Sequence, residues 1–80
     1  MELVEYVAVF QELNDQFYVF FPDLPGVETF GNSLVASKEE AEKILQDSII
    51  DTSNIPVATN IGRFEELYPK DILSLVQAKI

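Results

Sequence analysis

The stretch Phe17-Tyr-Val-Phe-Phe-Pro-Asp-Leu-Pro-Gly26 decides the fold of this 80-residue chain, because a run of aromatic residues passes directly into a turn. Aromatic and β-branched side chains suit a pleated, half-buried surface, so residues 17–21 are predicted to form a strand. Pro22 lacks a backbone N–H and Gly26 tolerates a positive φ, so the strand must end at Pro22 and the chain must turn by Gly26. The rest of the chain is predicted to pair with this unit or to cover it.

Two further strands are predicted on either side of this unit. Residues 3–11 form a first strand that is largely apolar on both faces. Residues 12–16 connect it to the second strand as a β-hairpin, and they include Asn14 and Asp15, which accept left-handed backbone conformations. Residues 27–31 are predicted to form a third strand, so the N-terminal part of the chain is an antiparallel meander.

A long helix follows the third strand. Ser33 is a favourable N-cap, because its hydroxyl can accept a hydrogen bond from a free N–H of the first turn. Ser37 and Glu40 also match a capping box, which leaves a start one turn later as the alternative. Apolar or small residues recur at three- and four-residue spacing as far as about Ile50, and they form one helical stripe of Leu34, Ser37, Ala41, Ile44, Leu45, Ser48 and Ile49.

The C-terminal part adds a polar connection over residues 51–60, a short helix at about residues 64–68 that Pro69 ends, and a last strand over residues 71–79. The whole chain, residues 1–80, is expected to be a single domain. The predicted class is α+β, with a small β-β-β-α-β(α) order, a mostly antiparallel sheet and one long helix packed on one face.

Charge limits the kinds of partner. Fourteen acidic and five basic residues give a net charge of −9, which argues against direct nucleic-acid binding. Residues 1–37 hold six acids and no base, which favours a basic partner, with a merely solubilising surface as the alternative. No apolar run reaches the length of a membrane span and no basic signal region is present, so a soluble cytoplasmic protein without membrane contact is expected.

The sheet has more apolar surface than one helix can cover. The second strand offers Phe17, Val19 and Phe21 on one face, and Tyr18 and Phe20 on the other. Monomers rarely leave such a face in water, so we expect a second chain to bury part of the sheet or its edge, as a homodimer or higher oligomer. The alternative is that the short helix and the loops cover the second face.

The usual catalytic and ligand-binding residue sets are missing. The chain has no histidine and no cysteine, and its three glycines are isolated, so no catalytic triad, thiolate metal site or phosphate loop is expected. Asp23 and Glu28 could supply oxygen ligands to magnesium, but Asp23 is predicted instead to be a turn residue that bonds its own backbone. The chain is therefore expected to have no enzymatic activity, metal or cofactor.

The quoted turn, together with Tyr6-Val-Ala-Val-Phe10 before it and Thr29-Phe-Gly-Asn-Ser-Leu34 after it, resembles the HicB-like antitoxin family, as do Ala41 and Leu45 in the helix. The resemblance spans nearly the whole chain, with residues 71–80 in place of the family's last strand. It implies a partial, degenerate RNase H-like fold without nuclease activity. It also implies binding to a small, basic, mRNA-cleaving toxin of the HicA type, with the active site of the toxin covered.

The expected function is therefore that of a toxin-neutralising binding module. The residues expected to bind the partner are Glu12, Asp15, Tyr18, Phe20, Asp23 and Glu28. The residues expected to form a structural turn that shapes the surface are Phe21, Pro22, Leu24, Pro25 and Gly26. Charge pairs raise association rate and specificity more than affinity, so apolar contacts must supply much of the binding.

Two other functions remain open. One is a stand-alone HicB-like protein that binds a small ligand or an unrelated protein and has no toxin. The other is a residual RNase H-like, magnesium-dependent nuclease that uses Asp23, Glu28 and other carboxylates.

The chain departs from the family pattern at a few positions. Val27 stands where the family often has cysteine, Asp15-Gln16 where it often has Asp-Gly, and Ser37 where it often has alanine. Many antitoxins of this family carry a C-terminal DNA-binding part. No separate DNA-binding domain is expected here, so autoregulation by this chain alone is not expected.

Overall fold

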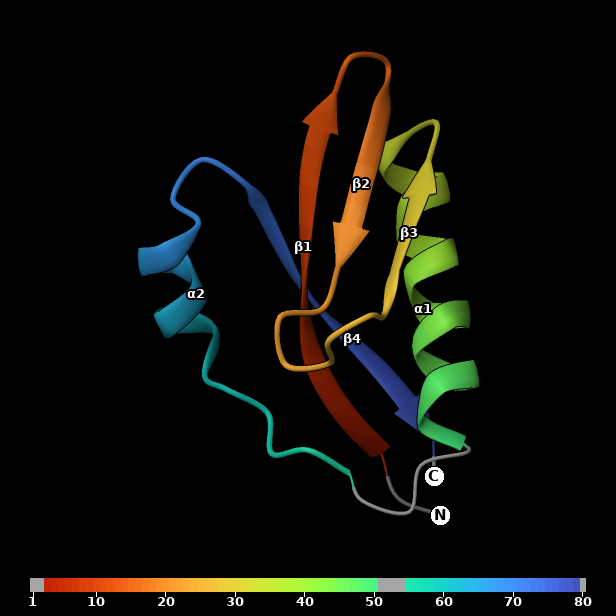
Figure 1. Cartoon of the computed structure of the whole chain (residues 1–80), viewed down its shortest axis with the longest axis vertical. Helices are drawn as coiled ribbons and strands as arrows, with labels where there is room; N and C mark the ends of the chain where they lie inside the picture. The colour runs from red at the N-terminus through yellow and green to blue at the C-terminus, as the bar shows by residue number, and fades with distance from the viewer. Residues whose placement is uncertain (1–2, 51–54, 80) are drawn as a thin grey trace.

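Within residues 3–50 and 55–79, which the computed structural model describes, the chain forms four strands and two helices (Figure 1). The strands are β1 (Leu3–Leu13), β2 (Gln16–Phe20), β3 (Glu28–Gly31) and β4 (Ile72–Lys79), and the helices are α1 (Leu34–Ile50) and α2 (Ile61–Leu67). Every neighbouring pair is antiparallel, and the strand order in the sheet is β3-β2-β1-β4. The predicted α+β class and element order are confirmed.

The hairpin between β1 and β2 is tighter than predicted. The two strands stay paired from Val9 opposite Phe20 to Leu13 opposite Gln16, so the turn consists of Asn14 and Asp15 alone. Asn14 takes a left-handed conformation with φ 58°, which asparagine tolerates better than most residues. The tight turn fixes the register of the hairpin and therefore the face on which each aromatic residue lies.

The proline-containing turn after β2 is closed by its own backbone and packed on the core. Phe21 N donates to the carbonyl oxygen of Val27 at 3.2 Å, and Leu24 N donates to that of Phe21 at 2.9 Å. Gly26 has φ 87°, a conformation that costs glycine little. The side chains of Phe21 and Leu24 are buried in the main core cluster, so this turn closes one end of the core.

Helix α1 covers one face of the sheet with the predicted stripe. Ser33 Oγ accepts a hydrogen bond from Ala36 N at 3.1 Å, and the helix begins at Leu34, so the later start is wrong. The main core, between α1 and the sheet, consists of Tyr6, Ala8, Phe10, Val19, Phe21, Leu24, Ala41, Leu45, Ile49, Val76 and Ala78. We call the sheet face that carries this core the inner face.

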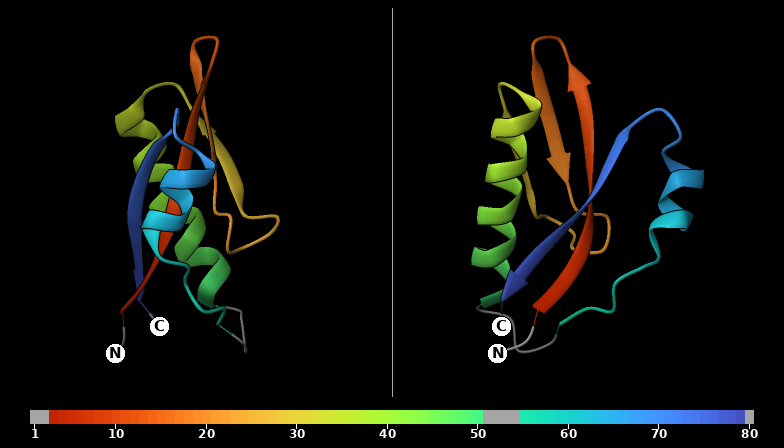
Figure 2. Two further views of the ribbon diagram at one scale, coloured as in Figure 1. Left: turned by 90° about the vertical axis from the view of Figure 1, so that its left-hand side faces the viewer. Right: turned by 180° about the vertical axis from the view of Figure 1, so that it is seen from behind.

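The opposite, outer face is partly covered. Val7 and Val9 point to this face by alternation, and both are buried. Tyr68, next to the C-terminal end of α2, packs its ring against Phe20 with centroids 5.6 Å apart, which places α2 on the outer side. Figure 2 shows α1 and α2 on opposite sides of β4. The expectation that a second chain buries part of the sheet stays a prediction. Its alternative, cover by the short helix, is right in part, because α2 shields the middle of the outer face.

Helix α2 begins three residues earlier than the predicted position, Phe64. Asn60 caps it, with Oδ1 accepting from Gly62 N at 2.8 Å, and Pro69 follows the C-cap Tyr68. Of the connection predicted over residues 51–60, residues 51–54 lie outside the described ranges, and residues 55–60 form no regular element. No helix in the described part of the chain is long and apolar enough to cross a lipid bilayer.

Candidate functional site

Three aromatic rings on the outer face form a continuous surface near the β3 edge of the sheet. Tyr18 of β2 lies opposite Phe30 of β3, and their ring centroids are 5.2 Å apart. Tyr18 also stacks on Phe20, two residues along β2, at 5.4 Å. Phe30 is 55% exposed, whereas the other two rings are half-buried. We call Tyr18, Phe20 and Phe30 the aromatic patch.

Helix α2 supports the patch from its far side. The rings of Tyr68 and Phe20 meet edge to face with their centroids 5.6 Å apart, and the ring centroids of Phe64 and Tyr68 are 6.3 Å apart. Phe64 is buried, so this row of rings runs from the protein interior to solvent. Aromatic pairs in such geometries stabilise their arrangement beyond the burial of their area, so these contacts hold the rings of the patch in a fixed arrangement.

An acidic group borders the patch. The Tyr18 hydroxyl donates to Glu28 Oε2 at 2.6 Å, a short charge-assisted bond between neighbouring strands. This hydrogen bond, with smaller effects from burial and from the Glu28 charge, raises the pKa of Tyr18 above its ordinary value. The carboxylate is thereby held beside the aromatic surface.

The remaining predicted partner-binding acids do not join this patch. Glu12 and Asp15 are exposed at the hairpin end, and Glu12 lies opposite Phe17, which packs against the inner core. Glu12 is therefore on the other face from Tyr18, although both belong to one hairpin. These two acids extend the negative surface without contacting the aromatic rings.

Asp23 has a partner far away in the sequence. Its Oδ2 accepts from Thr59 N at 2.8 Å, and its Oδ1 accepts from Thr59 Oγ1 at 2.6 Å. The expectation that Asp23 bonds its own turn backbone is wrong, because the segment before α2 passes beside the turn and supplies both donors. Tyr6 donates its hydroxyl to the carbonyl oxygen of Pro56 in the same segment. Asp23 thus acts as an anchor that holds the connection to α2.

Two residues of this site were not predicted from the sequence. Phe30 is spaced two residues from Glu28, so alternation alone would have placed it on the same face. Tyr68 contacts Phe20, which lies 48 residues earlier in the chain, and no local sequence pattern predicts that contact. Within residues 3–50 and 55–79 no group of three or more acidic, histidine or cysteine side chains could hold a metal ion.

Comparison with known proteins identifies the fold. No protein-family model and no curated protein sequence matches the chain. The N-terminal domain of the antitoxin HicB from Burkholderia pseudomallei superposes with a TM-score of 0.79 at 13% identity, over 96% of this chain and all (100%) of that domain.

Two toxin–antitoxin structures are similarly close. A chain of the toxin–antitoxin complex from Streptococcus pneumoniae matches with a TM-score of 0.77 at 18% identity, over 98% of this chain and 70% of that one. A chain of the HicA3 and HicB3 complex matches with a TM-score of 0.75 at 19% identity, over 96% of this chain and 100% of that one. The resemblance to HicB antitoxins is thus confirmed for the fold.

Proposed function

We propose that this chain is the antitoxin of a toxin–antitoxin pair and acts by binding its toxin. The likeness to the HicB N-terminal domain, which extends over 96% of the chain, supports this role. The observation that carries the proposal is the aromatic patch with Glu28 at its border, an exposed apolar surface with a fixed charge. Aromatic side chains in well-ordered surroundings are the residues that most often dominate binding energy at protein interfaces.

The proposed partner is a small, basic, mRNA-cleaving toxin of the HicA type. A net charge of −9 on 80 residues attracts a basic protein over distances of about 10 Å at moderate ionic strength. In this proposal the toxin lies on the patch and its active site is covered, which prevents cleavage of mRNA. The antitoxin itself carries out no reaction, acts in the cytoplasm and makes no direct contact with nucleic acid.

The predicted residues have separate roles in this proposal. Tyr18, Phe20 and Phe30 provide the apolar contact and determine how slowly the complex dissociates. Glu12 and Asp15, which project into solvent, speed the encounter with a basic surface. Asp23 contributes indirectly, because it holds the segment that positions α2 behind the patch.

The first experiment is co-expression with any short basic protein that a neighbouring reading frame encodes. We expect a stable complex and relief of the growth arrest that this neighbour causes when expressed alone. Phe30→Ala and Tyr18→Ala should each weaken binding by about 1–3 kcal/mol in titration calorimetry. Val57→Ala serves as a matched control, because Val57 is 91% exposed and lies outside the patch.

Kinetics separate the two kinds of contact. Glu12→Gln combined with Asp15→Asn should lower the association rate and the salt dependence, with little effect on dissociation. Absence of a complex, or unrelieved growth arrest, would refute the antitoxin role and favour the stand-alone binding protein. Magnesium-dependent RNA cleavage that Asp23→Asn abolishes would instead establish the nuclease.

A further inference from the structure

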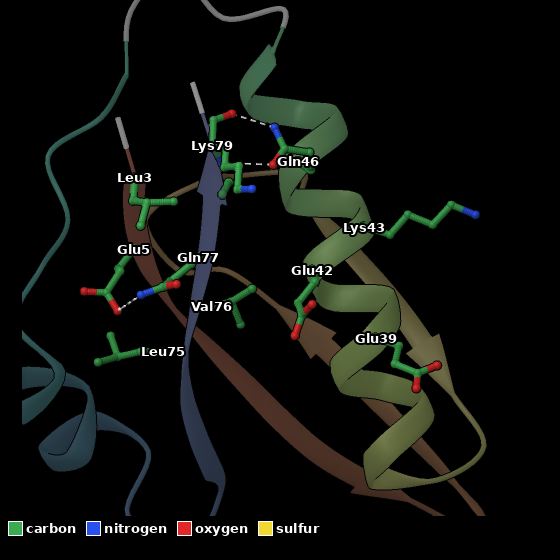
Figure 3. Close-up of a pocket in the computed structure, with 11 residues that line it drawn as sticks. Leu3, Glu5, Glu39, Glu42, Lys43, Gln46, Leu75, Val76, Gln77 and Lys79 are labelled. Carbon is green, nitrogen blue, oxygen red and sulfur yellow. Dashed lines mark hydrogen bonds between the residues drawn. The ribbon is translucent and has the colours of Figure 1, made fainter. Parts of the chain in front are cut away.

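Strand β4 is an edge strand of the sheet, and alternate residues point their backbone N–H and C=O groups away from β1. Gln46 of α1 pairs with Lys79 at the end of this edge: Gln46 Nε2 donates to the Lys79 carbonyl oxygen at 2.6 Å, and Lys79 N donates to Gln46 Oε1 at 2.9 Å (Figure 3). The backbone of Lys79 therefore points away from β1. Because this direction alternates along an antiparallel strand, the N–H and C=O groups of Leu73, Leu75 and Gln77 also point away from β1.

A groove of about 720 Å³ lies along the C-terminal half of this edge, at residues 75–79. Glu39, Glu42 and Lys43 of α1 line one side, and Leu75 and Gln77 lie on the side away from the helix (Figure 3). We call it the edge groove. The unpaired backbone N–H and C=O groups of β4 line the base of this groove. They can form hydrogen bonds with the backbone of another extended strand, so such a strand is the occupant that suits the groove.

The two edges of the sheet differ in how well they are protected. At the far edge, β3 has only four residues, whereas β4 has eight. Leu75 is 51% exposed and Ile72 is 42% exposed on β4. Natural proteins usually block long apolar edge strands, because such strands pair with other chains. In the part of the chain that the structure describes, Gln46 blocks this edge at Lys79 alone, which leaves residues 73–77 open.

We propose that the edge groove binds a second copy of this chain, with the two β4 strands antiparallel about a two-fold axis at Leu75. In this register Leu75 lies opposite the second copy's Leu75, and Leu73 lies opposite its Gln77. In each of these pairs the free backbone N–H and C=O groups of both residues face the other copy. The two β4 strands can therefore form backbone hydrogen bonds with each other at these positions. The result is a continuous sheet of two copies with both α1 helices on one face.

The sequence of β4 is complementary to itself in this register. No two like charges are opposed between residues 71 and 79. Asp71 comes to the same level as the oppositely charged Lys79 of the second copy, where Gln46 keeps the Lys79 backbone out of the ladder. Ile72 comes opposite the second copy's Ala78, and Leu75 comes opposite the second copy's Leu75. The dimer therefore buries these two exposed side chains. The net charge of the groove walls is small, with Glu5, Glu39 and Glu42 against Lys43 and Lys79. Self-association is therefore less opposed here than the overall charge of −9 suggests.

The first test measures the mass of the purified chain by sedimentation across a concentration series. We expect a monomer–dimer equilibrium for the natural chain. Leu75→Lys places like charges opposite each other at the axis, and it should raise the dimer dissociation constant about tenfold or more. Val35→Lys is the matched control, because it makes the same charge change at a side chain that is 70% exposed and outside the groove. Circular dichroism must show that both variants are folded.

The second test fixes the register. The chain has no cysteine, so Leu75→Cys introduces a single thiol. A directly opposed hydrogen-bonded pair has its Cα atoms about 5.5 Å apart, which a disulfide can span. Mild oxidation with oxidised glutathione should therefore link Leu75→Cys into covalent dimers on a non-reducing denaturing gel, while Val35→Cys should stay largely uncrosslinked there.

Three results would overturn the proposal: a monomer at all concentrations, an undiminished dimer in folded Leu75→Lys, or a natural dimer in which Leu75→Cys does not crosslink. If only a partner protein occupies the groove, the chain alone will be monomeric, which is the first of these results. Dimerisation through the edge groove and toxin binding through the aromatic patch are independent proposals. Leu75→Lys should still bind the toxin, and Phe30→Ala should still dimerise.

Discussion

At Gly31, β3 approaches α1 so closely that a side chain has no room. A Cβ atom at this position would lie 2.7 Å from Ser37 Cα and 2.8 Å from Ser37 N. It would also lie 2.2 Å from Ser37 Oγ, but a hydroxyl can move and a helical backbone cannot move without disturbing the packed core. Ser37 is itself buried and donates its hydroxyl to the Ser33 carbonyl oxygen at 2.6 Å. Glycine is thus required at position 31 for close packing.

Gly31→Ala should therefore destabilise the protein by about 1–3 kcal/mol in urea unfolding, the range found for overpacked cores. Adding Ser37→Ala should restore only a small part of this loss, because the clash with the backbone remains. If the double variant were as stable as the natural chain, the clash with the Ser37 hydroxyl alone would explain the loss, and the explanation by the backbone would be wrong.

At the level of elements, the turn at residues 21–27 holds α2 in place. Asp23 accepts two hydrogen bonds from Thr59, and Tyr6 donates to the Pro56 carbonyl oxygen. These contacts join the segment before α2 to the turn and to β1. Helix α2 follows this anchored segment and lies on the outer face, where Tyr68 supports Phe20.

Asp23→Ala should lower the free energy of unfolding by about 2 kcal/mol, because hydrogen bonds to a charged group are lost at a half-buried site. Thr59→Val should cost less, because it keeps the bond from the backbone. Hydrogen exchange should also show faster exchange of the Thr59 amide in Asp23→Ala. Asp47→Ala, at an exposed position of α1, is the control and should be nearly neutral.

For the whole molecule, two tyrosines couple stability to alkaline pH. Burial, followed by the nearby charge of Asp23, raises the pKa of Tyr6, and the hydrogen bond to Glu28 is the main cause of the raised pKa of Tyr18. In the unfolded chain both phenols ionise near pH 10. Above that pH the unfolded state releases protons that the folded state retains, so stability falls as pH rises further.

The free energy of unfolding should therefore show no contribution to its pH dependence from these phenols below about pH 9, and a loss above about pH 10. Tyr6→Phe should be less stable at neutral pH by about 1 kcal/mol, because the bond to Pro56 is lost. Its alkaline loss should nevertheless be smaller than in the natural chain. An equally steep loss in the Tyr6→Phe and Tyr18→Phe double variant would contradict this explanation.

Patterns of neighbouring residues determined the strands, the order of elements and α1. The aromatic run before Pro22 predicts β2, the spacing of Ala41 and Leu45 predicts the buried face of α1, and Ser33 predicts its start. Each of these features depends on residues close together in the chain, where alternation or helical periodicity applies. The RNase H-like relationship and the single-domain organisation remain predictions.

The tertiary structure alone decided how distant segments meet. It placed Thr59 beside Asp23, Tyr68 on Phe20 and Gln46 on the backbone of Lys79, contacts that span 33 residues or more. Pairs this far apart leave no periodic trace in one sequence, because only the folded path brings their donors and acceptors together. The sequence by itself therefore determined the elements and the acidic, aromatic character of the chain. The tertiary structure decided which aromatic rings form one surface and which strand edge stays open.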